Sequence, residues 1–134
     1  NLRRKIALQF SQAVKNCKFL LPQATSKDKK HSYLTFTVRI INKDVSWKNF
    51  RKKFKEFGGT GIFASWKLLY QEDVFKNGNW KKQCPKLYKN YKHHVCKNAE
   101  KIQKQLLQFP LNFKDTKSAQ KSILALKKTI KYFD

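Results

Sequence analysis

The sequence predicts an all-α fold, a single-domain antiparallel bundle of five helices that spans residues 1–134. Apolar residues recur at every third or fourth position along most of the chain, which is typical of amphipathic helices. Short polar, glycine- or proline-containing segments separate these stretches, and a hydrophobic content of 40% is enough to build one core. With no internal repeat and no long linker, one globular unit is expected.

The first helix is predicted to begin at Leu2 and to end before Pro22. Its apolar face is formed by Leu2, Ile6, Phe10, Ala13, Val14, Cys17 and Leu21. The second helix is predicted to continue to Gly58-Gly59, with Leu34, Val38, Ile41, Val45, Trp47, Phe50, Phe54 and Phe57 inward. Residues 33–41 are rich in β-branched side chains and would suit a strand, but the spacing favours a helix; a break near Asp44 is compatible with it.

Three further helices complete the predicted bundle. The third follows Thr60, carries Ile62, Trp66, Leu69 and Tyr70 inward, and stops at Asn77-Gly78. The fourth has Pro85 in its first turn and ends at Pro110, with Tyr88, Tyr91, Val95, Ala99, Ile102 and Leu106 along one face. The fifth follows the capping pair Asp115-Thr116 and buries Ala119, Ile123, Leu126 and Ile130.

The charge of the chain indicates a polyanionic partner. Lys and Arg total 31 against 8 Asp and Glu, a formal net charge of +23. Nucleic acid, anionic lipid and acidic glycan all fit this balance. Residues predicted to bind a membrane or polyanion are Arg3, Arg4, Lys5, Arg51, Lys52, Lys53, Lys82, Lys86, Lys89, Lys97, Lys101, Lys104, Lys121 and Lys128. Each cluster alone also fits a solvated helix face; together, with so few acids between them, they favour binding.

The fourth predicted helix carries the longest cationic track. From Lys82 to Lys104, with His93 included, basic side chains follow one another at three or four residues over roughly 30 Å of helix. Such a track would attract a polyanion and would be weakened by salt.

Aromatic residues are unusually abundant. The chain has 11 Phe, 5 Tyr and 3 Trp but no Met. Trp47 and Trp66 lie on apolar faces and are predicted to be core, whereas Trp80 lies beside lysines and is predicted to be exposed. The candidate membrane-interface aromatics are Phe75, Trp80, Phe109, Phe113 and Phe133. Of the four phenylalanines, which lie near helix ends, half would instead cover the ends of the core.

No catalytic constellation is evident in the sequence. The carboxylates are scattered, and there is no acid/base pair, glycine-rich phosphate loop or nucleophile motif. We therefore expect no enzymatic activity, no cofactor, no metal and no small-molecule substrate. The alternative of a metal site at His93-His94-x-Cys96 is disfavoured, since successive side chains on a helix point about 100° apart.

The cysteines and the first residue bear on processing. The sequence starts at Asn1 and lacks a run of roughly 20 apolar residues, so we expect a soluble mature form from which a signal peptide was removed. Cys84 and Cys96 would be about 18 Å apart on one helix and could not bridge each other. Cys17 could reach either one, and the pairing stays open.

A spaced pattern in the middle of the chain resembles a known family. Its residues are Phe36-Thr37-Val38-Arg39, Trp47-Lys48-Asn49-Phe50, and Gly58-Gly59 leading into Thr60, Ile62, Trp66, Leu69 and Glu72. The pattern is similar to that of the abalone sperm acrosomal proteins, which comprise lysin and its fusagenic paralogue. The resemblance implies a secreted helical bundle, stored in the sperm acrosomal vesicle, that acts at the egg without enzymatic turnover.

Composition separates the two branches of that family. Lysin contains Met and lacks Cys, whereas this chain has 3 Cys and no Met, which is more similar to the fusagenic branch. The implied function is binding to the anionic egg plasma membrane and promotion of sperm–egg membrane fusion. The alternatives are lysin-type binding and dissolution of the egg vitelline envelope glycoprotein and, third, a basic nucleic-acid-binding module. No receptor or dimer residue of lysin is carried over to this chain.

Overall fold

The protein is a mixed α/β structure with a four-stranded antiparallel sheet, so the prediction of an all-α five-helix bundle is wrong. The computed structural model describes residues 1–89 and 95–134. They form two compact units, unit 1 (Asn1–Ser65 and Gln105–Asp134) and unit 2 (Trp66–Lys104). Unit 1 contains α1 (Leu2–Val14), β1 (Leu20–Pro22), β2 (Thr35–Ile40), α2 (Trp47–Glu56), β3 (Phe63–Ala64), β4 (Leu106–Pro110) and α6 (Thr116–Phe133).

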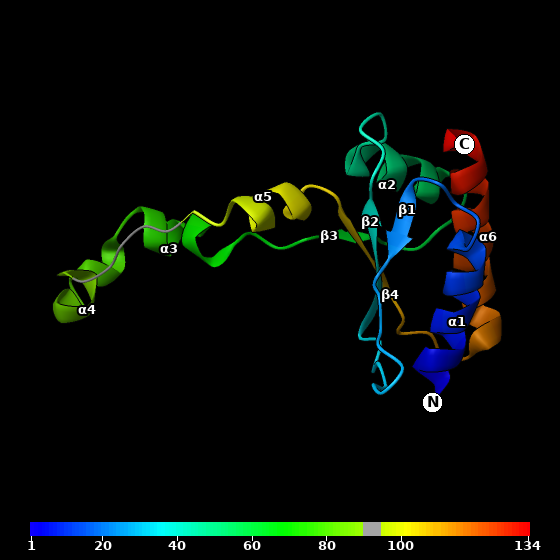
Figure 1. Cartoon of the computed structure of the whole chain (residues 1–134), viewed down its shortest axis with the longest axis horizontal. Coiled ribbons are helices and arrows are strands. Elements are labelled where there is room, and N and C mark those ends of the chain that lie inside the picture. The colour runs from blue at the N-terminus through cyan, green and yellow to red at the C-terminus, as the bar shows by residue number, and fades with distance from the viewer. Residues whose placement is uncertain (90–94) are drawn as a thin grey trace. The chain divides into compact units, whose positions relative to one another are not determined.

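The sheet of unit 1 has the strand order β1-β2-β4-β3, and all neighbours are antiparallel (Figure 1). Along β2 burial alternates strictly, with Phe36, Val38 and Ile40 buried and the residues between them half-buried. This period of two is that of a strand, and it corrects the helix predicted across this segment. Phe36 pairs with Phe109 of β4, a distant partner that no local spacing reveals.

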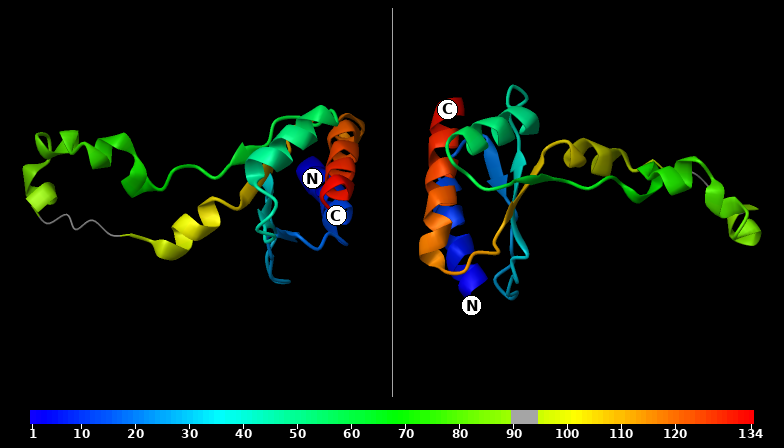
Figure 2. Two further views of the ribbon diagram at one scale, coloured as in Figure 1. Left: turned by 90° about the horizontal axis from the view of Figure 1, so that it is seen from above. Right: turned by 180° about the vertical axis from the view of Figure 1, so that it is seen from behind.

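One face of the sheet carries the core. The helices α1 and α6 lie side by side (Figures 1 and 2), and buried side chains of α1, α2 and α6 join the inward-facing side chains of the strands in one cluster. Phe109 lies at its centre, because its ring centroid is 5.6 Å from that of Phe10 in α1 and 5.4 Å from that of Phe54 in α2. Unit 1 therefore has two layers, three helices on a sheet.

Two boundaries of the predicted helices differ from those in the structure, and each difference has an identifiable reason. The first helix stops at Val14, and Pro22 is not a helix terminator but the last residue of β1, paired with Val38. The second predicted helix is in fact β2 followed by α2, whose N-cap is Ser46. The Ser46 hydroxyl accepts from Asn49 N–H at 3.2 Å, which satisfies a backbone donor at the start of α2.

The C-terminal helix agrees with its prediction. Asp115 is its N-cap, and the Asp115 Oδ1 carboxylate oxygen accepts from Ser118 N–H at 2.7 Å. The four residues predicted to face inward, Ala119, Ile123, Leu126 and Ile130, are all buried.

Unit 2 replaces the third predicted helix and most of the fourth with short elements. It comprises 3-10 turns at Leu69–Gln71 and Asn79–Lys81 and the helices α3 (Asp73–Lys76), α4 (Pro85–Lys89) and α5 (Lys97–Gln103). Pro85 does occupy the first turn of a helix, as predicted. The inward positions predicted for Trp66 and Leu69 are wrong, since these side chains are 83% and 71% exposed. Tyr91 and His93 lie outside the described residues.

Candidate functional site

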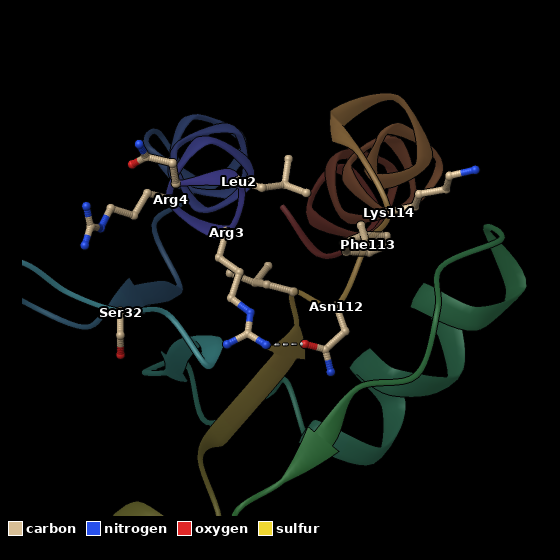
Figure 3. Close-up of a pocket in the computed structure, with 9 residues that line it drawn as sticks. Leu2, Arg3, Arg4, Ser32, Asn112, Phe113 and Lys114 are labelled. Carbon is tan, nitrogen blue, oxygen red and sulfur yellow. Dashed lines mark hydrogen bonds between the residues drawn. The ribbon is translucent and has the colours of Figure 1, made fainter.

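A cavity of about 770 Å³ lies in unit 1, beside the first turn of α1 (Figure 3). The helix α1 contributes one wall, and the segment that connects β4 to α6 contributes another. The cavity is lined by Asn1, Leu2, Arg3, Arg4, Ser32, Leu111, Asn112, Phe113 and Lys114.

Hydrogen bonds position both arginines of this cavity. Arg3 Nη2 donates to Asn112 Oδ1 at 3.1 Å, which ties α1 to the β4–α6 connection (Figure 3). Arg4 Nε donates to the backbone oxygen of His31 at 3.1 Å. The His31 ring is stacked on Tyr33 with centroids 4.1 Å apart, and its Nδ1 accepts from Tyr33 N–H at 2.8 Å. Tyr33 adopts a φ of 52°, so a tight turn presents the His31 carbonyl to Arg4.

The cavity is basic. Arg3, Arg4 and Lys114 supply three cationic side chains, and no Asp or Glu is among the lining residues. Guanidinium groups bind carboxylate or phosphate through paired N–H donors, so the cavity is chemically suited to an anionic group.

Sequence reasoning finds only part of this cavity. Arg3 and Arg4 are predicted to bind anions together with Lys5, which is exposed but does not line the cavity. Lys114 is missed, because a single lysine between Phe113 and Asp115 carries no charge pattern of its own. Its proximity to α1 depends on contacts between segments distant in sequence, among them the packing of α1 against α6 and the Arg3–Asn112 hydrogen bond.

Two of the three predicted basic residues of α2, Arg51 and Lys53, make contacts within unit 1. Arg51 Nε donates to the backbone oxygen of Ile62 at 3.2 Å. Lys53 Nζ forms an ion pair with Glu56 at 2.8 Å and lies 4.5 Å from the ring centroid of Tyr132. The hydrogen bond with Lys53 lowers the pKa of Glu56, and the same bond raises the pKa of Lys53. Lys52 is exposed.

The long cationic track does not form as predicted. Its members among the described residues are all exposed, but α4 ends at Lys89 and α5 begins only at Lys97, so no single described helix carries them. The residues concerned are Lys82, Lys86, Lys89, Lys97, Lys101 and Lys104.

The helix α6 carries several exposed lysines of unit 1. Lys121 and Lys128 are predicted to bind anions and are exposed, as are Lys117, Lys127 and Lys131 of the same helix. Among the described residues only two ion pairs occur, Lys53–Glu56 and Lys67–Asp73, and neither involves α6. The lysines of α6 are therefore not neutralised by carboxylates of the described residues.

The candidate interface aromatics are mostly structural. Phe109 is 1% exposed and belongs to the core, so its assignment to a membrane interface is wrong. Phe113 and Phe133 are half-buried and pack against the core, and Phe75 and Trp80 contact each other with centroids 6.0 Å apart. Trp80 is half-buried, not exposed as predicted, while Trp47 packs against the core as predicted.

A polar cluster in unit 2 has no counterpart in the sequence predictions. Tyr70 O–H donates to Glu100 Oε1 at 3.1 Å, Gln71 Nε2 donates to the same oxygen at 3.2 Å, and Cys96 N–H donates to Tyr70 Oη at 3.1 Å. Desolvation is the main cause that raises the pKa of Tyr70, and the Glu100 contact adds to it. The hydrogen bonds of this cluster hold the 3-10 turn at residues 69–71 against α5.

The thiols are free. Cys17 is half-buried, while Cys84 and Cys96 are exposed. Burial raises the pKa of the Cys17 thiol.

Over residues 1–89 and 95–134 no group of three or more potential metal ligands occurs, and His93 and His94 lie outside these ranges. In the same residues, none of the helices combines the length and apolar character needed to span a bilayer.

Comparisons with known proteins identify the fold. No protein-family model and no curated protein matches the sequence. Among solved structures, the aminotransferase TlmJ from Streptoalloteichus hindustanus matches with a TM-score of 0.71 at 14% identity over 98% of this chain and 31% of that chain. Helicobacter pylori PseC, an aminotransferase involved in the biosynthesis of pseudoaminic acid, matches with a TM-score of 0.70 at 18% identity over 98% of this chain and 32% of that chain.

The likeness shows a fold shared with part of each of these two structures and nothing finer. Identities of 14% and 18% are too low to carry over residues or substrates. The chain spans about a third of the length of both aminotransferases.

Proposed function

We propose that this chain serves as one domain of an aminotransferase-like protein. The observation that supports the proposal is the structural likeness over 98% of the chain to a third of two aminotransferases. The remaining two thirds would come from further sequence of the same protein or from a partner subunit.

The described residues do not form an aminotransferase centre by themselves. Aminotransferase chemistry uses pyridoxal phosphate, which requires a lysine for a Schiff base and a charged partner for the pyridine nitrogen. Every described lysine is exposed except Lys53, which is half-buried and bound to Glu56. A Schiff-base lysine is activated when its amine is desolvated, and no described lysine is buried in that way. In this proposal the chain would contribute binding surface, and the other part would supply the reacting groups.

The basic cavity indicates what this domain would contribute. Arg3, Arg4 and Lys114 are among the residues that line the cavity and no acidic residue is, which suits a carboxylate or phosphate group of a substrate or of the companion domain. In this proposal the isolated chain would have no enzymatic activity, whereas the complete species would.

An isotope-transfer assay on the native protein tests the proposal. An antibody against α6 would isolate the species that contains this chain, and transfer of ¹⁵N from glutamate to carbonyl acceptors would be followed by mass spectrometry. We expect transfer by the native species and none by the isolated chain. A native species that consists of this chain alone and transfers no nitrogen would overturn the proposal.

A second candidate is the binding of anionic membranes, including the sperm–egg fusion role implied by the resemblance to the abalone acrosomal proteins. The net charge of +23 and the unneutralised lysines of α6 among the described residues favour it. The implied helical bundle no longer supports it, because the fold is mixed α/β. Lipid mixing between anionic vesicles, compared with a charge-matched helical protein, tests this candidate; mixing no greater than that control would count against it.

A further inference from the structure

A second cleft lies on the outer side of the sheet in unit 1, around Arg39. Three of its lining side chains are apolar, Leu21, Pro22 and Leu106, and the others are Gln23, Thr37 and Arg39. Its volume of about 370 Å³ falls within the range of small-ligand pockets, roughly 300–1,000 Å³. It shares no lining residue with the basic cavity beside α1.

The register of the strands builds this cleft. Arg39 lies between Leu21 of β1 and Leu106 of β4, and both pairs are antiparallel neighbours. Because side chains alternate along a strand, the residues on either side of Arg39, Val38 and Ile40, are directed into the core. The same alternation places Arg39 and its two leucine neighbours on the face opposite the helices.

A hydrogen bond at Nε orients the guanidinium group of Arg39. Arg39 Nε donates to Gln105 Oε1 at 2.7 Å, a short bond of the charge-assisted kind. An arginine carries five N–H donors in a fixed plane, so this bond leaves the two Nη groups as the outward edge of the fork. Of the ion pairs among the described residues, none includes Arg39.

We propose that the Arg39 cleft binds a small carboxylate that carries a short apolar group. The fork of Arg39 would bind the carboxylate through two parallel hydrogen bonds, and Leu21, Pro22 and Leu106 would cover the apolar part. The inference stands apart from the aminotransferase proposal, since it uses different residues and predicts binding by the isolated chain.

Isothermal titration calorimetry with hexanoate tests the inference. Acetate, which lacks the apolar chain, and hexanol, which lacks the carboxylate, are the comparison probes. Hexanoate is expected to bind at least about tenfold more tightly than hexanol, because a charge-assisted hydrogen bond contributes about 1.5–3 kcal/mol. It is also expected to bind at least about tenfold more tightly than acetate, because acetate lacks the methylenes that the apolar side chains would cover. Equal binding of hexanol, or tighter binding of inorganic phosphate, would overturn the inference.

Matched variants separate the cleft from general attraction to a basic protein. Arg39→Gln is expected to weaken hexanoate binding about tenfold, and Arg39→Lys to weaken it by less, since it keeps the charge but loses the fork. Arg51→Gln removes the same charge from α2 and should change binding by less than about twofold. Equal weakening by Arg39→Gln and Arg51→Gln would contradict the site. Leu106→Gln provides a second variant if Arg39→Gln does not fold, and unchanged hexanoate binding in it would likewise contradict the site.

Discussion

The hydroxyl of Thr60 lies 3.0 Å from the hydroxyl of Ser122, and Thr60 N–H also approaches the Ser122 oxygen at 3.3 Å. Ser122 is buried in α6, whereas Thr60 belongs to the segment that leaves α2 for β3. This contact ties the connection between α2 and β3 to the C-terminal helix, 62 positions away.

Replacing Ser122 by Ala should destabilise unit 1 by about 1–2 kcal/mol, because the Thr60 N–H and hydroxyl lose a partner. Urea unfolding of the single variants Ser122→Ala and Thr60→Ala and of the double variant measures the coupling. We expect the double variant to be less destabilised than the sum of the singles by about 0.5–1.5 kcal/mol. Fully additive effects would show that the contact contributes no stability.

Gly59→Ala should destabilise the protein by about 1–3 kcal/mol, because an added Cβ would overlap the ring of the buried Phe54. Gly61→Ala is the matched control, since a Cβ there meets nothing nearby, and it should be close to neutral. Thermal unfolding of both variants checks the prediction. Equal melting temperatures for the two would mean that the packing of the α2–β3 connection on Phe54 is wrong.

Phe109→Ala should cost about 3–5 kcal/mol in the free energy of unfolding, because it removes the ring around which the phenylalanines of α1 and α2 pack. Phe63→Ala, at a side chain that is 55% exposed, should cost far less. Chemical denaturation measures both. The opposite order of effects would fit an exposed, membrane-facing Phe109 and contradict the sheet register.

Cys17 should be the slowest of the three thiols to react with iodoacetamide at a mildly alkaline pH. Burial raises the pKa of its thiol, so less of the reactive thiolate is present at a given pH, and access to it is limited. Cys84 and Cys96 are exposed and should be labelled first. Peptide mapping after timed quenching gives the order, and loss of protection of Cys17 in denaturant is the control. Rapid labelling of Cys17 in the folded state would disagree with its position against the core.

The elements that the sequence predicts well are those whose evidence is local. The apolar face and N-cap of α6 lie within one stretch of chain, so spacing and the Asp115 cap are enough. The helix predicted in place of β2 is wrong because Leu34, Val38 and Ile41 also fit a helical spacing, while the strand's true partners in β1 and β4 are distant in sequence. β-Branched residues give the correct signal there, and tertiary pairing decides between the two.

The candidate sites also combine residues that a local sequence pattern predicts with residues that only the fold brings together. Adjacent arginines mark one wall of the basic cavity, but Lys114 reaches it only through the fold. The Arg39 cleft depends on the register that places Leu21 and Leu106 on either side of one cation. The interface assignment of Phe109 fails because proximity to a proline indicates an element end and not whether the ring faces the core.

The molecular mass of the native species that contains this chain, measured by native mass spectrometry, decides whether the chain is one domain of a larger aminotransferase-like protein. We expect a polypeptide or complex about three times as large as the 134-residue chain or larger, since the chain spans 31% and 32% of the two similar aminotransferases. A stable native species with the mass of the 134-residue chain alone would contradict it.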